Sequence, residues 1–381
     1  MKINARFVLA SVLILCSTIF TGYSQSRILK KLMSNEPDTT RSPSFLPLPA
    51  IAYSKVTGLE LGLAGLYSFY SDRKDTLTRS SNFTGLATFT TKKQANFSLK
   101  ADIWSPKNIY HYTGEIRYRN FPFKFYGIGD KTIEADEDNI TQNLFRLTSE
   151  LEKLLLKNYY GGVNVSFENY SFKDRETGGI YTTNPFILDK DGGKVLFFGL
   201  SQIFDSRNTN TYTTKGLYLK LNYSYAPDFF KDENFTGSLI KADARSFNSL
   251  SKKTVLGFNA VYQSLRGESA PFYLLPQFGS DLIMRGYYTG RYRNENLLAL
   301  QTEFRYRFIP RLGAAAFFGM GTSYSKNSFK LGDLKPSYGG GLRYFFDVER
   351  GMNVRFDYAL GEKRSGEGRQ SSFYISFGEA F

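Results

Sequence analysis

The residues Glu295-Asn-Leu-Leu-Ala-Leu-Gln-Thr-Glu-Phe-Arg-Tyr-Arg-Phe308 alternate between apolar and polar side chains. One face carries Leu298, Leu300, Phe304, Tyr306 and Phe308, and the other carries Glu295, Gln301, Glu303, Arg305 and Arg307. A period of two is the spacing of a β-strand, whose successive side chains point to opposite faces of the sheet. A strand of this length with one apolar and one charged face is typical of a transmembrane barrel with a polar lumen.

The same alternation recurs from about residue 45 to the end of the chain. A soluble sandwich would show the same alternation, but the strand length, the aromatic strand ends and the export signal favour a membrane barrel. Together they predict an all-β, antiparallel transmembrane β-barrel of about sixteen strands, an even count of the kind that bacterial barrels have. The expected strands are 45–54, 58–70, 79–91, 94–104, 108–119, 139–154, 158–173, 193–203, 215–226, 235–248, 253–266, 295–308, 311–324, 336–346, 352–361 and 370–381. The first contains Pro47 and Pro49, which a strand tolerates at its start or at a sheet edge.

The connections between these strands indicate an orientation. With the N-terminus in the periplasm, short turns such as 105–107 and 309–310 face the periplasm, and the long connections face outward. The long connections are 120–138, 174–192, 227–234, 266–294, 325–335 and 362–369. Long outer loops and short periplasmic turns are the asymmetry expected of outer-membrane barrels.

Residues 1–24 read as a secretory signal peptide, with a basic start at Lys2 and Arg6 and an apolar core from Phe7 to Phe20. The single cysteine, Cys16, lies in that core, so disulfide and thiol chemistry are not expected in the mature chain. Residues 25–44 are a short periplasmic approach segment, and 45–381 are expected to form the outer-membrane barrel. No interior stretch approaches the roughly 20 apolar residues of a membrane-spanning helix.

The formal net charge is +14, and it falls to about +12 without Lys2 and Arg6. A basic exported protein has anionic lipid headgroups and lipopolysaccharide as expected partners. Nucleic acid is excluded as a partner, because export removes the chain from it and no run of Lys and Arg resembles a nucleic-acid-binding arm.

The stretch before the first quoted strand is Asp281-Leu-Ile-Met-Arg-Gly-Tyr-Tyr-Thr-Gly-Arg-Tyr-Arg293. Its last nine residues hold three arginines, two glycines and three tyrosines. Arginine offers a planar fork of donors to a carboxylate, and glycine lets the backbone pass close to other groups. Two interpretations follow from these residues alone: a solvated basic loop, or a loop folded back against a charged wall.

Met284-Arg285-Gly286-Tyr287 resembles the Val-Arg-Gly-Phe/Tyr signature in the sixth outer loop of the BamA/TamA family, also called the bacterial surface antigen family. The resemblance implies that this loop folds into the lumen and that Arg285 meets acidic residues on the next two strands. Glu303 matches the first of these acids, whereas Gly319 stands where the family usually has Asp. Asp357, which shares the polar face of its strand with Arg355, is the candidate substitute for the missing acid.

Further matches extend the resemblance over nearly all of 45–381. Residues 121–129 resemble a family loop, 205–208 a family turn, and 337–344 and 355–359 the two penultimate strands. Phe373, Ile375, Phe377 and Phe381 look like the C-terminal sorting signal read by the barrel assembly machinery, although Glu379 interrupts the alternation. The segment 25–44 is too short for a POTRA module, so no such module is expected.

The resemblance implies a non-enzymatic protein that assists protein or lipid insertion or translocation at the outer membrane, with an unknown client or periplasmic partner. A passive channel is one alternative, because the lumen face is charged. A barrel hydrolase is another, and it rests on His111 alone, without a Gly-x-Ser-x-Gly motif. No cofactor is expected and no metal site either, because acidic runs such as 136–138 are usually solvated and no ligand spacing suits zinc.

Overall fold

The computed structural model describes residues 40–54, 57–174, 176–231, 235–268 and 270–381. The expected signal peptide at 1–24 lies outside the described residues, as does the approach segment up to residue 39. In the described ranges, no helix is long and apolar enough to cross a membrane.

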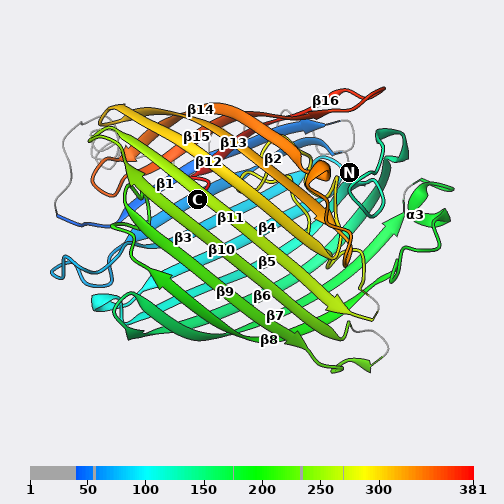
Figure 1. Cartoon of the computed structure of the whole chain (residues 1–381), viewed down its shortest axis with the longest axis horizontal. Coiled ribbons are helices and arrows are strands. Elements are labelled where there is room, and N and C mark those ends of the chain that lie inside the picture. The colour runs from blue at the N-terminus through cyan, green and yellow to red at the C-terminus, as the bar shows by residue number, and fades with distance from the viewer. Residues whose placement is uncertain (1–39, 55–56, 175, 232–234, 269) are drawn as a thin grey trace, which may run out of the picture.

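The chain forms sixteen strands and a few short helical turns (Figure 1). The strands are β1 (Ser44–Ser54), β2 (Gly58–Phe69), β3 (Ser81–Thr90), β4 (Ala95–Trp104), β5 (Tyr110–Phe125), β6 (Asp138–Leu156), β7 (Tyr159–Asp174), β8 (Gly192–Asp205), β9 (Gly216–Ala226), β10 (Gly237–Ser249), β11 (Thr254–Gly267), β12 (Asn296–Ile309), β13 (Leu312–Tyr324), β14 (Lys335–Asp347), β15 (Met352–Lys363) and β16 (Arg369–Phe377). The helical turns are η1 (Pro106–Asn108), η2 (Glu134–Asp136), α3 (Ile180–Thr183) and η4 (Leu331–Asp333).

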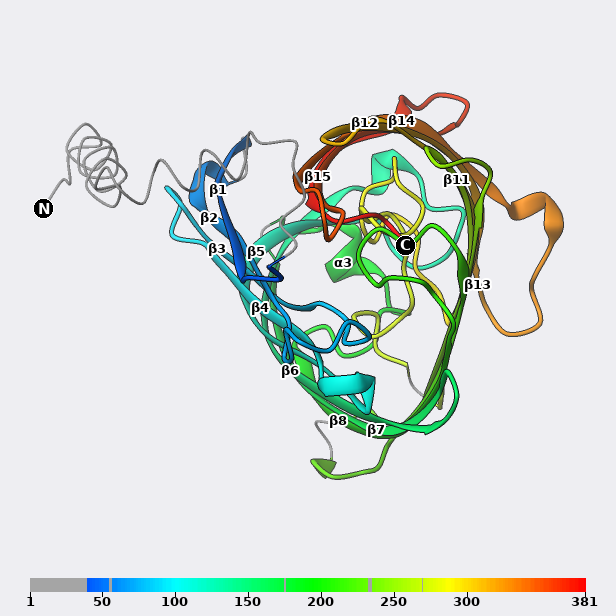
Figure 2. The same cartoon turned by 90° about the vertical axis from the view of Figure 1, so that its left-hand side faces the viewer.

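The strands form one antiparallel sheet in which each pairs with the next along the chain, from β1 to β16. This confirms the predicted all-β architecture and the count of sixteen. Figure 2 shows the sheet curling round an interior that holds loops and the C-terminal end of the chain. The alternation explains the two faces: on β9, Leu219 and Leu221 are exposed on the outward face, whereas Lys220 points inward to Glu150 and Glu152.

Strand β5 is longer than predicted and runs to Phe125, so residues 121–125 are not the loop that the resemblance implied. Beyond Asn120, which pairs with Ala95, β5 has no further partner on β4 and pairs only with β6. Pro122 lacks an N–H, and a strand tolerates that loss on a free edge. The hairpin of β5 and β6 can therefore continue through the proline.

The last strand is shorter than predicted, because β16 ends at Phe377 rather than continuing to residue 381. Gly378 has a φ of 73°, a left-handed conformation that glycine adopts without strain. The chain turns there, and Figure 2 shows its C-terminal end inside the curled sheet. We call residues 378–381 the inner tail.

The long connection between β11 and β12 also enters the interior, where Figure 2 shows it as the yellow trace. Its side chains Phe272, Phe278, Met284, Tyr287 and Tyr292 are all buried. We call residues 270–295 the inner loop. Two of the segments that fill the interior are therefore this loop, from the end with the long connections, and the inner tail, from the end with the short turns.

The two edges of the sheet, β1 and β16, face one another across a seam. In the part of the chain that the structure describes, no backbone pairing joins them. Apolar side chains bridge one end of the seam instead: Leu46 of β1 and Leu66 of β2 pack with Phe346, Met352 and Val354 of β14 and β15. The Arg350 side chain also donates to the Ser42 carbonyl oxygen.

Candidate functional site

The signature residues of the inner loop lie directly against the sheet wall formed by β12 to β16. Met284 and Gly286 both have positive φ, at 53° and 102°, so the backbone makes a tight turn around Arg285. A Cβ on Gly286 would lie 2.7 Å from the carbonyl carbon of Leu360 on β15. Glycine is therefore required here, because a side chain would push the loop off the wall.

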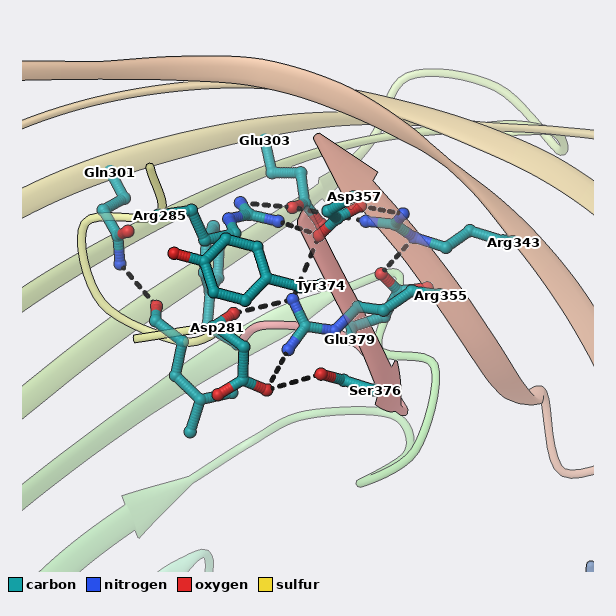
Figure 3. Close-up of polar contacts among 12 residues, drawn as sticks. Asp281, Arg285, Gln301, Glu303, Arg343, Arg355, Asp357, Tyr374, Ser376 and Glu379 are labelled. Carbon is teal, nitrogen blue, oxygen red and sulfur yellow. Dashed lines mark hydrogen bonds and ion pairs between the residues drawn. The ribbon is translucent and has the colours of Figure 1, made fainter. Parts of the chain in front are cut away.

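Arg285 is buried and its guanidinium forks between two carboxylates (Figure 3). Its Nη2 donates to Oε2 of Glu303 and its Nη1 to Oδ2 of Asp357, each over 2.7 Å. Its Cζ lies 3.4 Å from the ring centroid of Phe317 on β13. Arginine can place one carboxylate opposite each of its two terminal nitrogens while its flat guanidinium stacks on an aromatic ring. Lysine cannot provide this geometry.

Three further arginines extend this arrangement into a network. Arg305 donates to Glu303 over 2.7 Å, Arg343 donates to Asp357 over 2.5 Å, and Arg355 donates to Asp281 of the loop over 2.7 Å. We call the network the charge cluster; its members are Arg285, Arg305, Arg343, Arg355, Asp281, Glu303, Asp357 and Glu379. Four cations and four carboxylates balance, which is the condition under which buried charges are tolerated.

Tyr287 fastens the loop to the place where β14 and β15 separate. Its hydroxyl donates to the Pro336 carbonyl oxygen over 2.5 Å and accepts from the Glu362 N–H over 2.9 Å. The ring lies on Gly361, where an added Cβ would come within 2.7 Å of Tyr287 Cζ. The tyrosine thus satisfies backbone groups that the diverging strands leave open.

Gly341, the last residue of the run Gly339-Gly340-Gly341, makes room for the charge cluster. A Cβ on Gly341 would lie 2.2 Å from Oδ1 of Asp357, and one on Gly339 would lie 2.8 Å from Cζ of Phe317. The Asp357 side chain passes over the backbone of Gly341, and the Phe317 side chain passes over that of Gly339, to reach Arg285. The glycines are explained by this close approach of neighbouring side chains.

Gly319 lies beneath the loop, but the space above it is occupied. A Cβ there would lie 3.2 Å from Cγ of Gln301 and 3.5 Å from Sδ of Met284. Gln301 accepts from the Met284 N–H over 3.0 Å and donates to the Leu282 carbonyl oxygen over 3.1 Å. Position 319 therefore serves loop packing, and the second carboxylate on Arg285 comes from Asp357.

Gly319→Asp is expected to lower the free energy of unfolding by about 1–3 kcal/mol, because the new side chain must displace the buried Met284 or Gln301. Gly319→Asn is the matched control, since it has the same size without the charge. Thermal unfolding of the purified barrel measures both. An aspartate variant more stable than the asparagine variant would show that a carboxylate is missing at this position.

The outer part of the inner loop is held by other long connections. Arg291 donates to Glu367 over 3.0 Å, and its carbonyl oxygen accepts from the Thr132 hydroxyl. Burial raises the pKa of the Tyr292 phenol to about 12, and its hydrogen bond to Glu362 adds to this. Arg293 packs over the rings of Phe125 and Phe272, and burial lowers its pKa to about 10.

The expected sorting-signal residues divide into two groups. Phe373 and Ile375 point outward and are 61% and 58% exposed, and Phe377 is half-buried at the seam. Phe381 is turned inward and is 6% exposed, against Phe247 of β10. The sorting role stays a prediction, and outward presentation here is confined to Phe373 and Ile375 among these four residues.

His111 sits inside the barrel near the end with the short turns. Its Nδ1 lies 2.6 Å from Oε2 of Glu152, its Nε2 lies 3.2 Å from Oδ1 of Asp102, and its ring stacks on Trp104. A general base in a hydrolase needs one ring nitrogen against a nucleophile. Both nitrogens of His111 face carboxylates, an arrangement that suits a structural ion pair.

The alternation along the strands predicts Glu303, Asp357 and Arg355 on the inner face, and the family resemblance implies that Arg285 lies in the lumen. Neither singles out Arg305, Arg343, Asp281 or Glu379 as members of one site. Arg305 was visible on the polar face of its strand, and Arg343 lay in a segment already matched. Glu379 gave a signal as well, since it broke the apolar alternation at the end of the chain.

Comparison with known proteins shows likeness at the level of the fold. No family model and no curated protein sequence matches the chain. Among solved structures, BamA from Haemophilus ducreyi lacking POTRA domains 1–3 is similar, with a TM-score of 0.54 and 12% identity over 89% of this chain and 70% of that one. CdiB from Acinetobacter baumannii has a TM-score of 0.54 and 10% identity over 88% of this chain and 59% of that one.

CdiB from Escherichia coli has a TM-score of 0.55 and 10% identity over 88% of this chain and 62% of that one. The chain thus spans about three fifths of the length of the two CdiB structures. The predicted resemblance to BamA-type barrels is confirmed as a likeness of fold.

Proposed function

We propose that this chain is a non-enzymatic outer-membrane barrel that assists the insertion or translocation of other proteins at the outer membrane. The observation that carries the proposal is the seam: β1 and β16 are unpaired edges, and the wall beside them contacts the inner loop through Arg285. An unpaired strand edge is a template for pairing with another chain. The exposed Leu, Phe and Tyr side chains of the outward face would contact lipid.

The two prolines of β1 explain why the described strands β1 and β16 do not pair along the seam. Pro47 and Pro49 lack N–H groups, and prolines occur in strands where the missing donor faces away from the ladder. Since β1 pairs with β2 along its whole length, both missing donors are expected on the free edge. A complete ladder cannot form on that edge at Pro47 and Pro49, which keeps β16 from sealing against it. β16 itself contains no proline, so it is the edge whose donors a partner strand can pair with fully.

A passive channel is the second candidate, and the interior supports it less well. Two cavities of about 500 and 450 Å³ lie inside the barrel, lined by charged side chains. The inner loop and the inner tail lie in the same interior (Figure 2), where a solute would have to pass them. A hydrolase would need a nucleophile at His111, whose two nitrogens face Glu152 and Asp102.

A photo-crosslinking amino acid at Ile51 of β1 or Ile375 of β16 is expected to capture outer-membrane proteins during their assembly in cells. Both side chains are outward and exposed on the seam strands. Leu200 of β8 is the matched control, because it is similarly exposed on a strand away from the seam. Equal capture at Leu200 would contradict a role for the seam.

Depletion of the protein, followed by an inventory of the outer membrane, tests the function itself. An assembly factor predicts a fall in the levels of other outer-membrane proteins. An unchanged protein inventory together with altered solute uptake would favour the passive channel.

A further inference from the structure

The inner tail is held inside the barrel by a pocket of polar and aromatic side chains. Glu379 is buried and accepts from Nε of Arg343 and from the side-chain amide of Asn353, both over 2.9 Å. Nε of Arg305 lies 3.7 Å from the same carboxylate. Two buried arginines and an amide thus converge on one acid, which is strong recognition for a short segment.

The ring of Phe381 lies in a separate subsite. It packs against Phe247, and the Arg305 guanidinium lies over both rings, at 5.4 Å from Phe381 and 5.5 Å from Phe247. Beneath the ring is Gly257 of β11, where an added Cβ would come within 3.0 Å of the Phe381 ring. Nη2 of Arg305 also donates to the Phe381 carbonyl oxygen over 2.7 Å.

The inner tail lies between the two interior cavities. The larger cavity is lined by Ala380 and Phe381, and the smaller one by Gly378, Glu379 and Phe381. Phe381 borders both cavities, as do Thr113, Glu115, Thr148 and Arg245 of the barrel wall, so the tail lies where the two cavities meet. The tail also shares Arg343 and Arg305 with the two acids that hold Arg285.

We propose that Arg305, Arg343, Asn353, Phe247 and Gly257 form a binding site for an acidic, aromatic peptide segment, and that the inner tail occupies it as an internal plug. The site selects a glutamate two residues before an aromatic residue, the spacing of Glu379 and Phe381. Release of the tail vacates the site, which lies where the two cavities meet. This proposal does not depend on the seam having a client.

Accessibility of a single cysteine tests whether Glu379 holds the tail. The one native cysteine, Cys16, lies in the expected signal peptide, so Ala380→Cys gives the mature chain a unique thiol. Ala380 is buried, and a water-soluble maleimide should label the introduced thiol slowly in the folded full-length barrel. Adding Glu379→Gln removes the negative charge that faces Arg343 and Arg305 and sets an amide NH2 against one of the two donors that Glu379 accepts from. It should therefore speed labelling at least about tenfold.

Lys241→Cys is the matched control, since Lys241 is exposed in the larger cavity and does not contact the tail. Its labelling rate should be the same with and without Glu379→Gln. A labelling rate of the Ala380→Cys variant that Glu379→Gln leaves unchanged would overturn the proposal.

Gly257→Val is an independent variant, because it fills the space beneath Phe381 and leaves every charged residue in place. Combined with Ala380→Cys, it should also speed labelling of the introduced thiol. Failure to do so would count against the aromatic half of the site.

Binding of a peptide in trans tests the site itself. A fluorescent acetyl-Gly-Glu-Ala-Phe peptide should bind the barrel that lacks residues 378–381 and should not bind the full-length barrel. The same peptide with glutamine in place of glutamate should bind at least about tenfold more weakly. Absence of binding to the shortened, folded barrel would overturn the proposed site. If the shortened barrel does not fold, the labelling rate in the Gly257→Val background decides the matter.

Discussion

Replacing Glu303 with glutamine is expected to lower the free energy of unfolding by on the order of 3–5 kcal/mol, the cost of breaking a buried ion pair from one side. Glu303 accepts from both Arg285 and Arg305 over 2.7 Å, and Nη2 of Arg343 lies 3.6 Å away. The neutral amide leaves these buried guanidiniums with one carboxylate too few. The excess charge then falls where water cannot solvate it.

The temperature at which the folded barrel loses its resistance to detergent measures this loss. Glu115→Gln is the matched control: Glu115 also faces the interior and pairs with Arg117 over 2.6 Å, but it lies outside the charge cluster and is partly solvated. Its removal should change stability by less than about 1 kcal/mol. If both variants lose stability equally, then the charge cluster contributes no more to stability than an ordinary ion pair in the lumen.

The architecture was readable from the sequence because one physical requirement repeats along the whole chain. Each strand must present apolar side chains to one side and polar ones to the other, and a one-residue shift would invert both faces. Leu219 and Leu221 on the outward face of β9, with Lys220 between them pointing inward, show the requirement being met. The same alternation of inward and outward side chains predicts Glu303 on the inner face of β12.

The charge cluster was only partly readable, because its contacts join residues that are far apart in the chain. Arg285 and Asp357 are separated by 72 positions, and Arg305 and Phe381 by 76. The alternation along a strand tells which residues face inward. It does not give their height along the barrel axis or the direction in which an arginine side chain extends. Asp357 reaches Arg285 only because Gly341 leaves its path open.

Gly319 shows a second limit of sequence comparison. A missing acid at a signature position suggested an incomplete site, yet the described cluster has a carboxylate for each arginine. Asp357 supplies the charge, and Met284 and Gln301 fill the space. Loss of one residue was accommodated by a neighbour on another strand, which a position-by-position comparison does not reveal.

Arg285→Ala is expected to free the inner loop, and it also leaves the charge cluster with one carboxylate in excess. Glu303 retains Arg305, and Asp357 retains Arg343 and Arg355, so neither carboxylate is left alone. The loop, in contrast, loses two charge-assisted hydrogen bonds. Each contributes about 1.5–3 kcal/mol, so large openings should become at least about tenfold more frequent in single-channel recordings.

Arg245→Ala is the matched control for these recordings. Arg245 also lines the interior and pairs with Asp243 over 2.5 Å, yet it belongs to β10 and makes no contact within the charge cluster. If its loss raises conductance as much, then removal of side-chain volume explains the result and the loop does not obstruct the lumen.

Arg285→Lys separates charge from geometry at the same position. Lysine keeps the positive charge, but its ammonium cannot present a planar fork to Glu303 and Asp357 while lying flat on Phe317. If the fork holds the loop, the lysine variant should open nearly as often as the alanine variant. If charge alone holds it, the lysine variant should stay closed like the native barrel, and the planar contact with both strands would then be dispensable.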